Sequence, residues 1–261
     1  MAQNTDGLDH PLYRRAETVA DFRANIASVQ AKIAAAAARA GRSADDVRLL
    51  PVSKTVSEER IRLAVEAGCH QLGENKVQEA KRKWHNLSEL GISWSVIGHL
   101  QTNKAKDVAA FASEFQALDS RRVAEALERR LDTAGRFLDV YVQVNTSDEP
   151  QKYGVDPADT LAFLRDLKSF RNLRVRGFMT LALFSSETER VRSCFRLLRN
   201  LRDEVRDADP DLIGAGELSM GMSGDYEVAI EEGATCVRVG QAIFGARALP
   251  DSYYWPEAGG K

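Results

Sequence analysis

Apolar positions near the start of the chain repeat with the period of a helix. Within residues 16–40 they recur every three or four positions, at Val19, Phe22, Ile26, Val29 and Ile33. This spacing is typical of an amphipathic helix with one buried face. Gly41 follows, and glycine commonly ends a helix. Residues 1–14 lack any such pattern and are expected to form a loose arm.

Eight short apolar runs follow, and each predicts a strand. In chain order they are VRLLPVS, HQLGEN, SWSVIG, EFQAL, FLDVYVQVN, LRVRGFMTL, ELSMGMS and TCVRVGQAIFG. Helical patterns separate them, at 57–67, up to about 87, up to about 111, 120–133, from about 157, 186–207 and 224–233. Strands joined by helical crossovers pair in parallel. Eight such units predict a (β/α)8 barrel, and an open doubly wound sheet is the alternative that periodicity leaves open.

The bulk properties fit one such domain over 1–261, with 246–261 as a C-terminal tail. The chain is 44% hydrophobic and 28% charged, with a net charge of -2, which gives no reason to expect nucleic acid as a partner. The sequence has no apolar run of about 18 residues, so no membrane span is expected. Cys69, Cys194 and Cys236 lie far apart. They predict reduced thiols in a cytoplasmic protein, without a metal site.

One lysine stands where a buried strand meets a loop. Lys54 follows Leu50, Val52 and Ser53, and function in a (β/α)8 barrel lies at the carboxyl ends of the strands. A lysine in a desolvated place can lose its proton and attack a carbonyl carbon. The alternative is a lysine that extends into solvent at the rim. Both faces of this strand are apolar, so strand parity does not decide between them.

The last two strands end in groups suited to a phosphate. Ser223 precedes a helix, where free N–H groups favour an anion, although taken alone a simple helix cap is the favoured role for this serine. Arg238 lies in an apolar strand, two residues before Gly240 and Gln241. Loops after strands seven and eight commonly bind phosphate in barrels. The alternative role for Arg238 is a buried salt bridge to an acid that the sequence does not identify.

Other polar residues at strand ends allow two roles each. His99 could donate a proton or be a hydrogen-bonded wall residue, which is the commoner case, and Asn75 could cap a helix or touch a ligand. Met220 is more often a packing residue than a ligand contact. The role of Asn145 is left open.

Together these segments resemble the pyridoxal-phosphate homeostasis proteins of the YggS type. The matching motifs are PVSKT, GENKVQEA, WSVIGHLQTNK, VNTSDEPQKYGV, RGFMTLA and LSMGMSGDYEVAIEEGATCVRVGQAIFG, in order from about 47 to 245. Lys76 and Ser95 depart from the family's usual residues. Neither is expected to touch Lys54, Ser223 or Arg238, but both could alter the surface charge near the barrel mouth.

The resemblance implies a barrel of the alanine-racemase N-terminal type with an extra N-terminal helix. In it, Lys54 would hold pyridoxal 5'-phosphate as an internal aldimine. Ser223 and the backbone at Gly240 and Gln241 would bind the phosphate, and Arg238 would face the pyridine nitrogen. Asn75 and Met220 would line the ring pocket.

The resemblance also implies cofactor management in place of turnover. A cation beside the ring nitrogen disfavours its protonation and weakens the cofactor as an electron sink, yet alanine racemases use arginine there too. Those enzymes add a β-rich domain, whereas only some sixteen residues follow the last motif here. We therefore expect a monomer that binds the cofactor and exchanges it with apo-enzymes, with no catalytic residue assigned. The alternatives are a fold-type III enzyme, such as an amino-acid racemase or decarboxylase, and an aldolase-like barrel.

Overall fold

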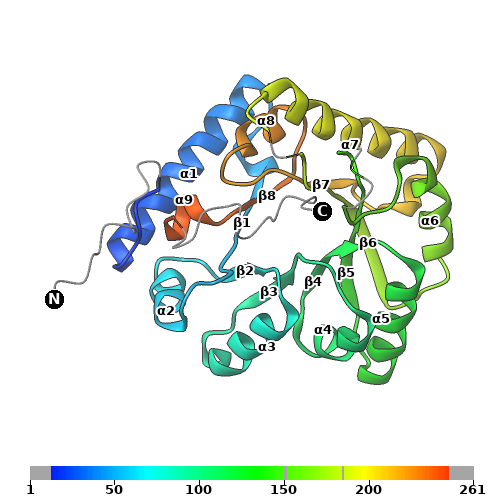
Figure 1. The fold of residues 1–261 in the computed structure, drawn as a ribbon, viewed down its shortest axis with the longest axis horizontal. Helices are drawn as coiled ribbons and strands as arrows, with labels where there is room; N and C mark the ends of the chain where they lie inside the picture. The colour runs from blue at the N-terminus through cyan, green and yellow to red at the C-terminus, as the bar shows by residue number, and fades with distance from the viewer. Residues whose placement is uncertain (1–12, 148, 150–151, 184, 247–261) are drawn as a thin grey trace, which may run out of the picture.

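The computed structural model describes residues 13–147, 149, 152–183 and 185–246, and it contains one eight-stranded parallel sheet (Figure 1). The strands are β1 Arg48–Pro51, β2 Gln71–Glu74, β3 Ser93–Val96, β4 Glu114–Leu118, β5 Leu138–Gln143, β6 Leu173–Met179, β7 Glu217–Ser219 and β8 Cys236–Val239. Their order in the sheet is β1-β8-β7-β6-β5-β4-β3-β2. The predicted strands are confirmed.

The sheet closes into a barrel where β1 meets β2. A single bridge between Val52 and Gly73 joins them, and the Ser53 amide donates to the Gly73 carbonyl at 3.0 Å. On its other side, β1 pairs with β8 along its whole length. Eight parallel strands in a nearly closed ring confirm the (β/α)8 prediction and rule out the open doubly wound sheet.

Helices surround the barrel on the outside (Figure 1). They are α1 Val19–Arg39, α2 Glu58–Glu66, α3 Val77–Asn86, α4 Ala105–Phe111, α5 Arg121–Ala134, α6 Thr160–Leu167, α7 Thr188–Ala208, α8 Tyr226–Glu231 and α9 Gln241–Phe244. The extra N-terminal helix α1 is confirmed. It begins at Val19 because Thr18 and Asp21 form a reciprocal capping box. The short helix α9 was not predicted, because four residues give no readable period.

The core lies between the outer face of the strands and the helices. Its largest fully buried apolar side chains include Trp94, Phe115, Phe178 and Phe195. None of the helices in the described ranges is long and apolar enough to span a bilayer. Most of the predicted arm (1–12) and tail (247–261) lies outside the described residues. Tyr13 is described, and its hydroxyl donates to the Ser223 carbonyl at 2.9 Å.

Candidate functional site

Lys54 lies at the carboxyl-terminal mouth of the barrel, in the turn that follows β1. The residue before it, Ser53, is fully buried, and Lys54 itself is half-buried. Thr55 has a φ of +66° and is the only residue other than glycine with positive φ in the described part of the chain. This backbone conformation is unfavourable for a β-branched residue. Contacts with the surrounding residues must therefore hold this turn, and they fix the position of the Lys54 backbone.

The turn after β8 lies against the end of β1. A Cβ atom added to Gly240 would lie 3.1 Å from the Val52 carbonyl oxygen, tighter than ordinary contact. Glycine thus permits the close approach of the two turns. Gly240 and Gln241, at the start of α9, lie beside the segment that carries Lys54.

Ser223 faces the same turn. Its hydroxyl accepts from the Ala242 amide at 3.4 Å, a long and weak hydrogen bond. The loop around it is ordered by Asp225, whose carboxylate accepts from the Met222 amide at 2.6 Å. Burial raises the pKa of the Asp225 carboxyl, although the Met222 hydrogen bond and Arg238 oppose the shift. The fold thus brings Ser223, Gly240 and the amide of Ala242 together, next to the end of β1.

Arg238 is buried inside the barrel, and its guanidinium donates two hydrogen bonds there. Nη1 donates to the Ser219 hydroxyl and Nη2 donates to the Thr180 carbonyl, both at 2.7 Å. Burial lowers the pKa of Arg238, while Cys236, Asp225 and Glu114 oppose the shift. Arg238 donates to a hydroxyl and to a carbonyl oxygen, and it forms no direct salt bridge with any acid among the described residues. The alternative of a buried salt bridge is therefore wrong for this part of the chain.

A chain of hydrogen bonds continues from Arg238 across the barrel interior. The Ser219 hydroxyl donates to Gln116 Oε1 at 2.7 Å, and Gln116 Nε2 donates to Glu114 Oε1 at 2.6 Å. Arg48 of β1 donates to Glu114 Oε2 at 2.8 Å. Strands β1 and β4 are not neighbours in the sheet, so this contact must cross the interior. Arg238 is therefore oriented by a polar chain that ends on a buried carboxylate.

Sequence reasoning missed this chain and misplaced one of its members. Ser95 is fully buried and donates to Glu114 Oε1 at 2.9 Å. The expectation that Ser95 alters the surface charge near the mouth is wrong, since its side chain lies in the interior. The available signal was the polar pair Glu114 and Gln116, two residues apart in an apolar strand and therefore on one face of it.

The other predicted site residues lie in different surroundings. Asn75 is exposed after β2, and a Cβ atom added to Gly98 would lie 2.1 Å from the Asn75 carbonyl oxygen, so the ends of β2 and β3 touch. Met220 has no exposed surface and belongs to the hydrophobic core. It offers no surface to a ligand in this conformation.

Two residues with open roles organise the rim. His99 Nδ1 lies 3.1 Å from Asp119 Oδ2, and its ring stacks on Tyr153 with the centroids 3.8 Å apart. These contacts fit the commoner of its two predicted roles, that of a hydrogen-bonded wall residue. Asn145 Nδ2 donates to the Glu149 carbonyl at 2.9 Å, so this side chain orders the loop after β5.

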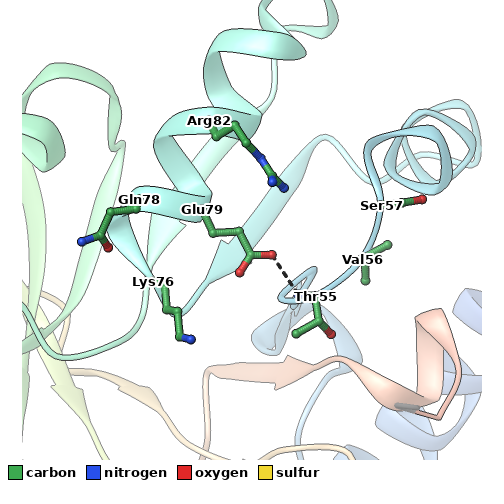
Figure 2. Close-up of a pocket in the computed structure, with 7 residues that line it drawn as sticks. All are labelled: Thr55, Val56, Ser57, Lys76, Gln78, Glu79 and Arg82. Carbon is green, nitrogen blue, oxygen red and sulfur yellow. Dashed lines mark hydrogen bonds between the residues drawn. The ribbon is translucent and has the colours of Figure 1, made fainter. Parts of the chain in front are cut away.

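A cavity of about 540 Å3 borders the Lys54 turn on the side of α3 (Figure 2). Thr55 and Ser57 line it from the turn after β1, and Lys76, Glu79 and Arg82 line it from the start of α3. A second cavity, of about 790 Å3, lies at the opposite end of the barrel, among the amino-terminal ends of the strands. The first cavity therefore lies between the residues after Lys54 and α3, and Lys54 itself is not among its lining residues.

The chain resembles known proteins over most of its length. Residues 24–248 match the model of the alanine racemase N-terminal domain. A protein of Aquifex aeolicus named pyridoxal phosphate homeostasis protein is 39% identical over 222 residues, which are 85% of this chain and 96% of that protein. A protein of the same name from Escherichia coli K12 is 39% identical over 230 residues, 87% of this chain and 97% of its own length.

Solved structures of similar proteins superpose on most of this chain. PipY of Synechococcus elongatus, solved with PLP bound, superposes with a TM-score of 0.76 at 33% identity, over 86% of this chain and 100% of PipY. Alanine racemase from Corynebacterium glutamicum gives a TM-score of 0.65 at 14% identity, over 92% of this chain and 65% of the racemase. At that identity the likeness to the racemase shows the fold alone.

Proposed function

The chain belongs to the pyridoxal phosphate homeostasis protein family, and from that premise we propose that it binds pyridoxal 5'-phosphate through Lys54. Its role is to hold this reactive cofactor inside the cell and to release it to apo-enzymes. The observation that carries the proposal is the adjacency of the Lys54 turn to Gly240 and Ser223 at one side of the barrel mouth.

The residues present fit the cofactor at each of its three polar ends. The Ser223 hydroxyl and the Ala242 amide, 3.4 Å apart, form a small cradle for a phosphate. Gly240 lacks the Cβ atom that would crowd the Val52 carbonyl, which keeps the backbone of this turn accessible. Arg238 supplies a fixed cation for the ring nitrogen, and Lys54 supplies the amine.

The chemistry of the cofactor explains the need for a lysine. Pyridoxal phosphate carries an aldehyde that condenses reversibly with amines. The Lys54 nitrogen would add to the aldehyde carbon as an unprotonated amine and form a Schiff base, with loss of one water molecule. Asn75 and Gln241 complete the proposed binding set. The setting we propose is the cytosol, supported by three unpaired, buried cysteine thiols.

The proposal is tested by absorption spectroscopy. Purified protein mixed with pyridoxal phosphate should gain a visible band that borohydride removes, and mass spectrometry should then locate the reduced adduct on the peptide with Lys54. Lys54→Ala should lose the band, whereas Lys106→Ala, which changes an exposed lysine on α4, should retain it. A full band in Lys54→Ala would refute the assignment of Lys54.

The same protein distinguishes the enzyme alternatives. A racemase or decarboxylase would exchange the α-proton of one amino acid in D2O or release CO2 from it at a catalytic rate. An aldolase-like barrel would form a borohydride-stable adduct with a phosphosugar, which differs in mass from the pyridoxal adduct. Cofactor binding without either activity is the expected result.

A further inference from the structure

A second lysine, Lys83, is completely buried close to the Lys54 turn. It lies on α3, and its side chain is among the largest fully buried ones in the described chain. Its ammonium donates to the Ser53 carbonyl at 2.8 Å, to Glu74 Oε1 at 2.7 Å and to Glu79 Oε1 at 2.7 Å. These three acceptors match the three protons of an ammonium.

The partners of Lys83 hold the residue on each side of Lys54. Ser53 is fixed through its carbonyl by Lys83, and its hydroxyl donates to Glu74 Oε1 at 2.6 Å. On the other side, the Thr55 amide donates to Glu79 Oε1 at 2.9 Å, as Figure 2 shows. One buried network therefore holds both neighbours of Lys54.

Part of this network acts on the backbone of the turn. The unfavourable positive φ of Thr55 lies within the region that Glu79 holds. Strained backbone of this kind persists where surrounding contacts over-determine it, and it gathers at functional sites. A buried ion pair is a weak stabiliser compared with apolar packing. Its placement on the two peptide units beside Lys54 indicates a role in geometry.

We propose that Lys83, with Glu74 and Glu79, is a positioning residue for Lys54. The network sets the height and direction from which the Lys54 amine reaches the aldehyde, and bond formation depends strongly on such alignment. In this reaction the carbon–nitrogen bond forms and one water leaves, and Lys83 itself takes no part in it. The inference rests on the proposed function, because it needs Lys54 to bind an aldehyde.

The test compares two ligands that differ at the reacting group. Pyridoxal 5'-phosphate carries the aldehyde, whereas pyridoxamine 5'-phosphate has the same ring and phosphate without it. In Lys83→Met we expect the visible band to appear at least about tenfold more slowly, because the amine is no longer aligned. The affinity for pyridoxamine phosphate should change by less than about threefold, because the hydrogen bonds of Ser223 and Arg238 share no partner with Lys83.

Lys81→Met is the matched control. It removes a lysine from the same helix, but Lys81 is exposed and pairs with Asp107 at 2.7 Å. This variant should form the band at the wild-type rate. Circular dichroism and thermal melting of both variants establish that they are folded at the temperature of the assay.

A second pair of variants tests the network while leaving Lys83 and Glu74 in place. Glu79→Ala removes the acceptor for the Thr55 amide, whereas Glu79→Gln retains an oxygen at that place. Glu79→Ala should slow band formation, and Glu79→Gln should restore most of the lost rate. This pair carries the test if Lys83→Met does not fold.

Three results have distinct meanings. Wild-type rates in Lys83→Met and Glu79→Ala would overturn the positioning role. Equal losses for both ligands would also overturn it, because they would indicate general damage to the fold. Failure of the wild-type protein to form any borohydride-reducible adduct at Lys54 would instead refute the proposed function itself.

Discussion

Ser219→Ala removes the hydroxyl that joins Arg238 to the interior of the barrel. The hydroxyl makes two buried hydrogen bonds of 2.7 Å, one from the Arg238 guanidinium and one to Gln116. Alanine would leave a charged donor and a neutral acceptor without this partner, in a place that water does not reach. A buried hydrogen bond to a charged group contributes about 1.5–3 kcal/mol, and a neutral one about 1 kcal/mol. We therefore expect the free energy of unfolding to fall by about 3 kcal/mol, since the two losses occur together.

Urea unfolding followed by tryptophan fluorescence measures this loss, because Trp94 is buried in the core. Ser193→Ala is the control, since its hydroxyl donates to the Arg190 carbonyl on an exposed helix face. It should change the free energy of unfolding by less than about 0.5 kcal/mol. If Ser219→Ala stays within that same margin of the wild type, with an unchanged slope against urea, the buried chain described here does not hold Arg238.

Three other experiments test different parts of the fold. Burial raises the pKa of Asp225 above 3.8, so its stabilising contribution is present below that pH and is lost as pH rises through the raised pKa. Asp225→Asn should therefore gain stability relative to wild type in urea titrations from about pH 4 to 7, and a constant difference would contradict the shift. Burial raises the pKa of Cys69 to about 11. At pH 8, Ellman's reagent should therefore label this thiol at least about tenfold more slowly in the native than in the unfolded protein. Fast labelling of the native protein, located at Cys69 by mass spectrometry, would refute this. Gly177→Ala would place a Cβ atom 1.9 Å from the Glu217 carbonyl oxygen and should cost at least about 3 kcal/mol. In the control Gly135→Ala the new Cβ atom meets no atom within 4 Å, and the change should cost about 1 kcal/mol because alanine disfavours this left-handed backbone. Gly177→Ala should therefore melt at a lower temperature than Gly135→Ala, and the opposite order would show that the β6–β7 contact is misplaced.

The barrel could be predicted because its signals are local. Each strand is a short apolar run, and each outer helix carries a repeating apolar face, so the alternation is visible without knowledge of any contact. The observed helix ends differ from the predicted ones where a side chain caps the helix, as Thr18 does for α1. Helix α9 escaped prediction because a single turn has no period to detect.

In the candidate site, too, some residues could be predicted from local signals and others could not. Lys54, Ser223 and Gly240 could be selected because they follow strands, and strand ends share one face of a barrel. The buried partners could not be found, because their pairing joins distant segments. Lys83 lies in the polar run KRKWHN, which looks like a solvated helix face, and yet it is fully buried against Glu74. Ser95 looked like a surface change because nothing local indicates that Glu114 lies across from it.

The junction between β1 and β2 has a consequence for how the ring behaves. Strands β1 and β2 are joined by one isolated bridge, between Val52 and Gly73, whereas β1 pairs with β8 at four successive positions. Lys83 of α3 reinforces this junction, because its ammonium bonds both to the Ser53 carbonyl after β1 and to Glu74 of β2. Amide hydrogens at this joint should exchange ahead of those in the β1–β8 ladder, and replacement of Lys83 should widen that difference.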